Sequence, residues 1–212
     1  MLPERTSAGA VAGHRKGRVP RALREQQILD VAEGLFLSKG YDDTSIEDIC
    51  RIADISRPIV YDLHGNKAAI YLACVRRARS GLEEAIAQAA MSSTDLEEQL
   101  ARGADAYFKV LEDDPRRWEL LFGVTGLLGE LADALTAERL RTIDYIATLL
   151  RSYAPYADPD RITAYANLIS GAADQLGRWW LCNRHIPRHT ITQYHADFVW
   201  SGGRDLLAES EG

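Results

Sequence analysis

Pro58 is the residue that most restricts how this chain can fold. Proline is tolerated in the first turn of a helix, where its missing amide hydrogen is not needed, but it breaks a helix interior. A helix must therefore begin near Arg57, and Ser56 is a suitable N-terminal cap. Because Gly65 follows soon after, we expect this helix to be short and to end at about Leu63.

A second short helix is predicted directly before it. Thr44 and Glu47 have the spacing of a capping box, in which the hydroxyl accepts a hydrogen bond from the amide of Glu47 and the carboxylate reaches back. This pattern predicts a helix over about residues 45–52, after which residues 53–56 can turn the chain. Two short helices joined by such a turn are typical of a helix-turn-helix unit, whose second helix enters the major groove of DNA.

A longer amphipathic helix should support this pair. Apolar residues recur at helical spacing from Ile28 to Phe36, and Lys39-Gly40 provides a cationic last turn and a residue that can take the left-handed conformation. Residues 1–20 show no periodicity and are predicted to be a flexible arm. We therefore expect a three-helix DNA-binding domain over residues 21–66.

The C-terminal domain, residues 67–212, is also predicted to be helical. A long helix starts near Lys67, and turn signals rich in Ser, Asp, Gly and Pro divide the rest, which ends in two helices over about 160–184 and 190–208. No segment alternates polar and apolar residues as a strand would. The predicted fold class is all-α, with three helices in the N-terminal domain and about six in the C-terminal domain.

The composition is that of a soluble globular protein, with 46% hydrophobic and 26% charged residues. No apolar run approaches the roughly eighteen residues of a membrane span, and no secretory signal is recognisable, so we expect a cytoplasmic protein. Cys50, Cys74 and Cys182 lie far apart and form no CxxC pair, which argues against a disulfide framework.

The two ends of the chain carry opposite charge. Residues 1–24 hold six basic residues and one acidic residue, whereas residues 68–212 hold 15 basic and 21 acidic residues. A basic arm before an acidic body fits contact of one end with a polyanion, and Arg15, Lys16 and Arg18 could reach the minor groove of DNA. A solubilising disordered tail explains the same charges equally well.

The stretch from Arg24 to Ile49 resembles the opening of the DNA-binding domain of TetR-family transcriptional regulators. Further residues continue the match in register, so that it covers about residues 24–72: Ala53, Ile55, Ser56, Arg57, Tyr61 and Lys67. The resemblance implies a homodimeric regulator, usually a repressor, that binds a palindromic operator and is released from it by a small molecule in its C-terminal domain.

The resemblance also implies the DNA-binding residues, with Arg57 reading a base and Thr44, Tyr61 and Lys67 holding phosphates. The full predicted surface consists of Thr44, Ser45, Ser56, Arg57, Pro58, Ile59, Tyr61 and Lys67.

Several residues depart from the family pattern. Asp54 stands where a glycine commonly makes the turn, which is tolerable because Asp visits the left-handed region more readily than most residues. Pro58 and Ile59 replace small and hydroxylated residues, so that Ile59 is expected to contact a thymine methyl group. Leu63 and His64 replace the customary aromatic pair, which leaves the orientation of His64 open.

The C-terminal domain should hold the ligand and the partner subunit. Aromatic and apolar residues of the middle helices are predicted to line a pocket for a hydrophobic or amphipathic ligand, with polar anchors from a later helix; the candidates are Tyr107, Phe108, Trp118, Leu121, Phe122, Tyr145, Leu149, Asn167, Asp174, Gln175 and Arg178. By resemblance, the last two helices form the dimer interface, with candidates Ile169, Ala173, Leu176, Trp180, Tyr194 and Phe198.

Two other functions remain open at this stage. An enzyme could use the C-terminal cavity, but no phosphate loop, nucleophile elbow or metalloprotease motif is present, so no cofactor is expected. Cys182, His185, His189 and His195 have loose metal-ligand spacing that Pro187 interrupts, and we expect no metal. A DNA-binding regulator controlled by a protein partner is the second alternative.

Overall fold

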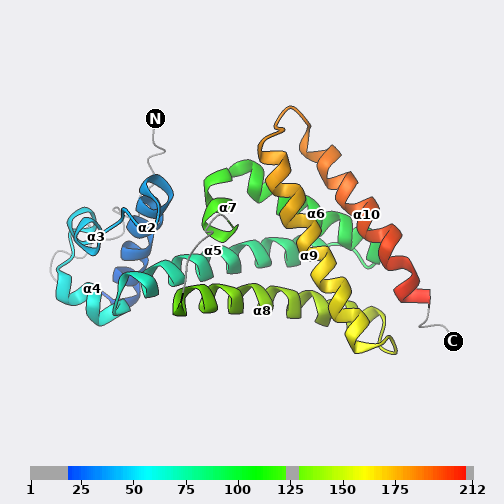
Figure 1. Ribbon diagram of the computed structural model, residues 1–212, viewed down its shortest axis with the longest axis horizontal. Helices are drawn as coiled ribbons and strands as arrows, with labels where there is room; N and C mark the ends of the chain where they lie inside the picture. Colours follow the sequence, from blue (N-terminus) through cyan, green and yellow to red (C-terminus); the bar gives the residue numbers. More distant parts are fainter. Residues whose placement is uncertain (1–18, 123–128, 209–212) are drawn as a thin grey trace. The chain divides into compact units, whose positions relative to one another are not determined.

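The computed structural model describes residues 19–122 and 129–208, and all regular secondary structure in these ranges is helical (Figure 1). This confirms the predicted all-α fold class. The chain forms two compact units, of which the first ends at Arg77 and the second begins at Ala78. Helix α5 (Lys67–Ala90) contributes residues to both units. No helix in the described ranges is long and apolar enough to cross a membrane.

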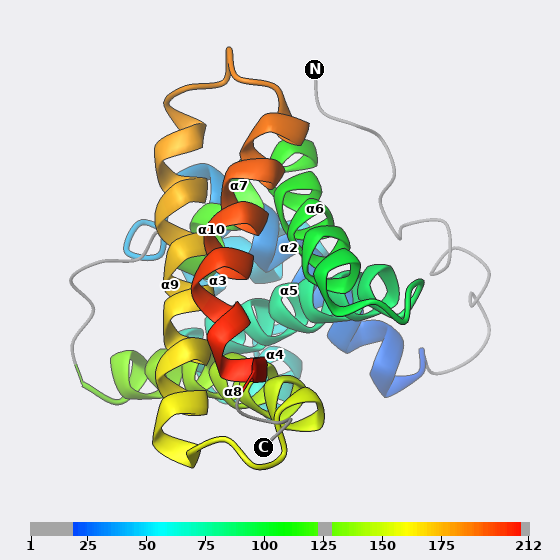
Figure 2. The same ribbon diagram turned by 90° about the vertical axis from the view of Figure 1, so that its right-hand side faces the viewer.

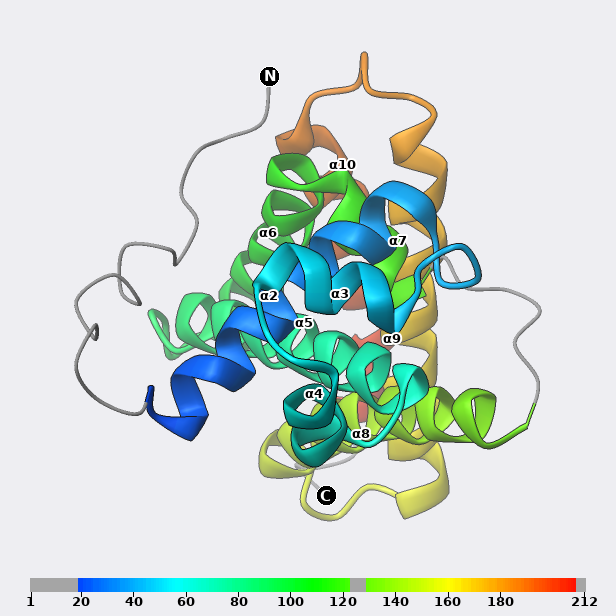
Figure 3. The same ribbon diagram turned by 90° about the vertical axis from the view of Figure 1, so that its left-hand side faces the viewer.

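The first unit contains α2 (Arg21–Lys39), α3 (Ile46–Ala53), α4 (Arg57–His64) and the start of α5 (Figure 3). All four elements lie close to the predicted bounds. Each contributes apolar side chains that are almost completely buried: Ile28, Ala32 and Phe36 from α2, Ile49 and Ala53 from α3, Val60 from α4, and Ile70, Tyr71, Cys74 and Val75 from α5. These side chains form the core on which the two short helices depend.

The turn between α3 and α4 has the predicted conformation. Asp54 has φ 52° and ψ 45°, in the left-handed region, and its amide donates to the carbonyl of Cys50. It is the only non-glycine residue in the described ranges with a positive φ. Ser56 then precedes α4, and Pro58 lies in the first turn of that helix, as its missing amide requires.

The predicted capping box is wrong by one residue. Ser45, not Thr44, caps α3, since its hydroxyl accepts a hydrogen bond from the amide of Asp48 at 3.0 Å. The Thr44 side chain is buried, and its hydroxyl donates to the carbonyl of Gly40 at 2.8 Å. Ser45 and Asp48 have the same spacing as Thr44 and Glu47, so the sequence alone does not choose between the two pairs. Burial of Thr44 makes the choice.

The second unit consists of the remainder of α5 with α6 (Leu96–Asp113), α7 (Pro115–Phe122), α8 (Glu130–Tyr153), α9 (Pro159–Leu181) and α10 (Arg188–Ala208) (Figure 2). The chain turns after α9, and α10 returns alongside it and packs extensively on α6. Arg188 of α10 forms ion pairs with Asp105 and Glu112 of α6, which fix this contact.

Two separate apolar clusters form the core of the second unit. One joins α5, α6, α9 and α10 around Phe108 and Trp180, and the indole of Trp180 donates to the carbonyl of Ile186 at 2.8 Å. The other joins α8 and α9 around Ile143, Leu150 and Ile162. Because both clusters use α9, this helix is a shared wall of the two halves of the unit.

We predict that Ser45→Ala destabilises the protein by about 1 kcal/mol, because the amide of Asp48 loses its capping partner. Denaturation by urea, followed by circular dichroism, measures this change. Ser56→Ala is the matched control, since the Ser56 side chain forms no capping hydrogen bond. An equal loss of stability in both variants would contradict the assignment of the cap.

Candidate DNA-binding surface and ligand pocket

Helix α4 buries one side and exposes the other. Val60 is buried, whereas Ser56, Arg57, Pro58 and Tyr61 are exposed and Ile59 is partly exposed. Six of the predicted contact residues belong to α4, to its cap or to the cap of α3, and the exposed ones lie in the cap and the first five residues of α4. A helix that presents its N-terminal residues in this way can place them at base edges in a major groove.

Arg57 is held by its neighbours. Its guanidinium forms an ion pair with Glu47 of α3 at 2.8 Å and donates to the hydroxyl of Tyr61 at 3.3 Å. The guanidinium carbon lies 5.4 Å from the centroid of the Tyr61 ring. The hydrogen bond with Tyr61 and the charge of Glu47 raise the pKa of Arg57 further, so that its positive charge is permanent. The side chain predicted to read a base is thus oriented before DNA is present.

Lys67 and Thr44 hold the loop between α2 and α3. The Lys67 ammonium donates to the carbonyls of Tyr41 and Asp42 at 2.9 and 3.2 Å and lies 4.4 Å from the centroid of the Tyr41 ring. The Thr44 hydroxyl bonds to Gly40 in the same loop. Both residues therefore determine where α3 begins. Their contact with phosphates stays a prediction.

His64 ends α4 with its side chain half-buried. The Nε2 atom is buried and has no hydrogen-bond partner among the described residues. Burial lowers the pKa of His64, so the ring is neutral at neutral pH. The structure thus settles the orientation that the sequence left open. The basic arm with Arg15, Lys16 and Arg18 lies outside the described residues.

The base of the first unit is fixed by a charged cluster. Arg77 of α5 bonds to Asp30 at 2.6 Å and to Glu33 at 2.5 Å, both on α2. Glu33 is buried, and its partner Arg77 has a raised pKa because both carboxylates stabilise its charge. The sequence analysis missed this cluster because the residues are far apart along the chain.

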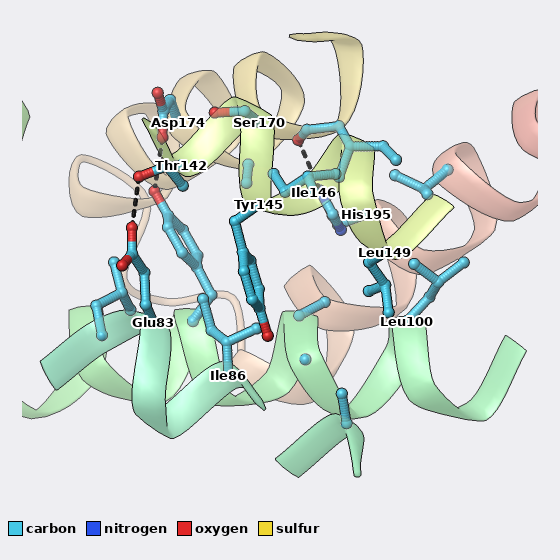
Figure 4. A pocket seen from close by; sticks show the side chains of 18 of the residues that line it. Glu83, Ile86, Leu100, Thr142, Tyr145, Ile146, Leu149, Ser170, Asp174 and His195 are labelled. Carbon is cyan, nitrogen blue, oxygen red and sulfur yellow. Dashed lines mark hydrogen bonds between the residues drawn. The ribbon is translucent and has the colours of Figure 1, made fainter. Parts of the chain in front are cut away.

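The second unit contains a cavity of about 140 Å³ between its two apolar clusters. Leu82, Ala104 and Tyr107 from one cluster line it, as do Ile146 and Ile169, which pack against the other. Most of the wall is apolar. Figure 4 shows Tyr145 and Ile146 in the middle of the pocket.

One end of the cavity is a network of charged and polar groups (Figure 4). The Thr142 hydroxyl donates to Glu83 at 2.7 Å and accepts a hydrogen bond from Arg79 at 2.9 Å. Asp174 accepts from the Tyr107 hydroxyl at 3.2 Å and lies 3.3 Å from Arg139. Burial lowers the pKa of Arg79 and raises that of Asp174. This network closes one end of an otherwise apolar space.

The predicted pocket residues have three different positions. Tyr107, Tyr145, Leu149 and Asp174 line the cavity. Phe108 and Leu121 pack in or against the core cluster around Trp180 instead. The side chains of Trp118 and Phe122 lie outside the described residues, and the remaining candidates, Asn167, Gln175 and Arg178, are exposed on α9 and do not line the cavity.

Several residues that define the pocket chemically were not expected there from the sequence, namely Arg79, Glu83, Arg139, Thr142 and His195. Each is a polar residue on an otherwise apolar helix face. That pattern could have indicated them, but it does not distinguish a pocket from a buried ion pair.

The predicted dimer residues also divide into two groups. Tyr194 and Phe198 are well exposed on α10, and Leu168 of α9 is exposed beside them. Ile169, Ala173 and Leu176 are partly buried. Trp180 is only 1% exposed and belongs to the core, so it does not lie on the surface as expected. Its neighbour Trp179 is exposed instead, because successive helical residues point about 100° apart.

The histidines near the α9–α10 turn do not form a metal site. No group of three or more His, Cys, Asp or Glu side chains within the described ranges could hold a metal ion. His195 lines the cavity on α10, whereas Cys182 is exposed at the end of α9.

We predict that Glu47→Gln increases the affinity for DNA about two- to fivefold at low salt, because it removes an anion beside the phosphate backbone while Tyr61 still orients Arg57. A fluorescence anisotropy titration with duplex DNA measures the effect. Glu97→Gln, an equal charge change at an exposed position of α6, is the control. The same change in both variants would mean that only net charge matters.

These features define a class of protein: an all-helical protein, over the described residues, with a helix-turn-helix unit of the kind that binds DNA and a second unit that contains a cavity. The model of bacterial regulatory proteins of the tetR family matches residues 28–74. Over these residues the chain is similar to the DNA-binding domain of TetR-family transcriptional regulators.

Similar proteins extend this comparison beyond the first unit. The transcriptional activator FasR from Mycolicibacterium smegmatis is 28% identical over 90% of this chain and 88% of its own. A TetR-like regulator from Rhodococcus sp. RHA1 has a TM-score of 0.65 and 27% identity, over 87% of this chain and 98% of that one. FadR from Bacillus subtilis, solved with stearoyl-CoA, shares the fold with a TM-score of 0.70 and 16% identity, over 84% and 98% of the two chains.

Proposed function

We propose that this protein binds a palindromic operator as a homodimer and that a small apolar or amphipathic molecule in the second unit controls this binding. One observation carries the proposal. Helices α9 and α10 supply part of the cavity wall, through residues such as Ser170 and His195, and also expose an apolar surface with Leu168 and Phe198. The same two helices can therefore respond to a ligand and bind a second subunit.

The exposed apolar surface supports a dimer. Leu168 and Phe198 border one groove between α9 and α10, and Tyr194 lies one helical turn before Phe198. Large apolar side chains that gather on one face favour association, since burial removes them from water. A two-fold partner also suits the first unit, because a palindrome presents two half-sites about 34–36 Å apart or at multiples of this distance.

Ligand control would act through α5. Arg77 of this helix binds Asp30 and Glu33 in the first unit, and Arg79, two residues later, lines the cavity in the second. A ligand that repositions Arg79 would therefore act on the helix that also holds α2. The ligand changes DNA binding only by the difference between its affinities for the two states of the protein.

The relatives support control by a ligand, but they do not decide whether the protein represses or activates transcription. The FadR complex shows that this fold can bind an acyl-CoA. FasR is named an activator, whereas the family resemblance favours repression. A regulator bound over a promoter blocks transcription, and one bound upstream can recruit polymerase. The position of the operator therefore decides between repression and activation.

We predict that Arg57→Ala weakens binding to the operator at least about tenfold and relaxes its sequence selectivity, because a base contact is lost. Binding to fragments of the upstream intergenic DNA, at several salt concentrations, measures this. Arg51→Ala on α3 removes an equal charge at an exposed position outside α4 and should reduce affinity less and without loss of selectivity. Equal losses of selectivity would contradict the role of Arg57.

We predict that Phe198→Glu converts the dimer to monomers and abolishes tight operator binding, because a buried unpaired carboxylate is strongly unfavourable. Sedimentation velocity gives the oligomeric state. Phe198 is 64% exposed, so the variant should fold. Tyr156→Glu, at a residue 84% exposed between α8 and α9, is the control and should remain dimeric. A dimeric Phe198→Glu protein would exclude this interface.

A further inference from the structure

His195 of α10 is a buried polar residue, and only one of its two ring nitrogens has a hydrogen-bond partner among the described residues. It is only 7% exposed and lines the cavity. The Nε2 atom lies 3.5 Å from the carbonyl oxygen of Ile169, whereas Nδ1 has no hydrogen-bond partner among the described residues. Figure 4 shows His195 across Tyr145 from Glu83, Thr142 and Asp174, so that the polar network does not supply the missing partner.

The contact with Ile169 favours one tautomer of His195 over the other. A carbonyl oxygen can only accept a hydrogen bond, so Nε2 carries the proton of the neutral ring and Nδ1 presents a lone pair. Burial lowers the pKa of His195, which keeps the ring neutral at neutral pH. The wall of the cavity therefore holds a buried acceptor without a partner among the described residues, and a ligand with a hydrogen-bond donor would satisfy it.

The charges around the cavity are balanced. Arg79 and Arg139 face Glu83 and Asp174, and each arginine is close to one of these partners or connected to it through Thr142. A carboxylate or phosphate in this space would add a negative charge without a matching cation, which a buried site disfavours. The balance favours an uncharged ligand.

The size of the cavity limits the ligand further. At about 140 Å³ it is close to the roughly 150 Å³ of an engineered apolar cavity that binds benzene in another protein. A molecule of about ten non-hydrogen atoms or fewer fits this volume. A single hydroxyl group provides the hydrogen-bond donor that Nδ1 lacks and adds no charge.

We propose that the ligand is a compact uncharged alcohol or phenol whose hydroxyl donates a hydrogen bond to Nδ1 of His195 and whose apolar part fills the space beside Tyr145 and Ile146. This inference deepens the ligand control proposed above and rests on it. The proposed site differs from one for an acidic lipid, because the ligand carries no charge and its hydroxyl group donates a hydrogen bond to a neutral imidazole ring.

Three probes with similar size test the chemistry. Isothermal titration calorimetry of the full-length protein with 1-octanol, with its isomer heptyl methyl ether, and with octanoate separates the donor from shape and charge. We expect 1-octanol to bind about tenfold more tightly than the ether, because the ether leaves Nδ1 without a partner, and octanoate to bind most weakly. Equal binding of alcohol and ether, tighter binding of octanoate, or no binding of any probe would overturn the proposal.

Two variants assign the preference to His195. His195→Phe keeps a ring but has no acceptor, so 1-octanol and the ether should bind equally. His195→Gln retains an acceptor and should keep part of the preference. A purely structural role of His195 would instead weaken both probes by the same factor. The comparison of probes on the unaltered protein needs neither variant, so it decides even if His195→Phe fails to fold.

Operator binding in the same preparation separates this inference from the proposed function. If 1-octanol binds with the expected preference and leaves operator affinity unchanged, the ligand class stands and ligand control is wrong. If none of the probes binds while another compound releases the operator, the ligand class is wrong and ligand control stands.

Discussion

Two arginines on α5 impose the constraint on which much of this structure depends. A guanidinium that leaves water needs partners that replace the hydrogen bonds it made with water. Arg77 finds Asp30 and Glu33 on α2, which positions the helix that supports the DNA-binding pair. Arg79 finds Thr142 on α8, with Glu83 behind it, which shapes one end of the cavity. One helix therefore carries charges that fix the interior of both units.

On the proposed DNA-binding surface, different residues anchor α4, set its direction and contact DNA. Val60 anchors α4 in the core, and the cap and turn residues before it set the direction of the helix. Arg57 can then be exposed and still be ordered, because Glu47 and Tyr61 hold it. An ordered arginine loses less conformational freedom when it meets a base, which favours selective binding.

The cavity is a consequence of how the second unit packs. Its two apolar clusters share α9 but remain separate, and the cavity lies between them. A network with equal numbers of positive and negative side chains closes one end of this cavity. His195 lies on the other side of Tyr145 from that network. Because α9 and α10 also present Leu168 and Phe198 to the outside, a ligand inside and a partner outside would act on the same helices. This arrangement would give the proposed control of a dimer by a small molecule a physical basis.

The sequence by itself determined the features that depend on neighbours along the chain. Pro58 required a helix start near Arg57, and periodicity with turn signals placed α2, α3, α5, α9 and α10 close to their observed bounds, whereas the bounds of α6, α7 and α8 were not predicted. Tertiary structure decided between alternatives that the local sequence patterns fit equally well. Because Thr44 is buried, Ser45 caps α3, and packing places Trp180 in the core and not on the surface. Tertiary structure also joined Arg79 to Thr142 and left Nδ1 of His195 without a partner within residues 19–122 and 129–208, because contacts between distant helices have no signature in local spacing.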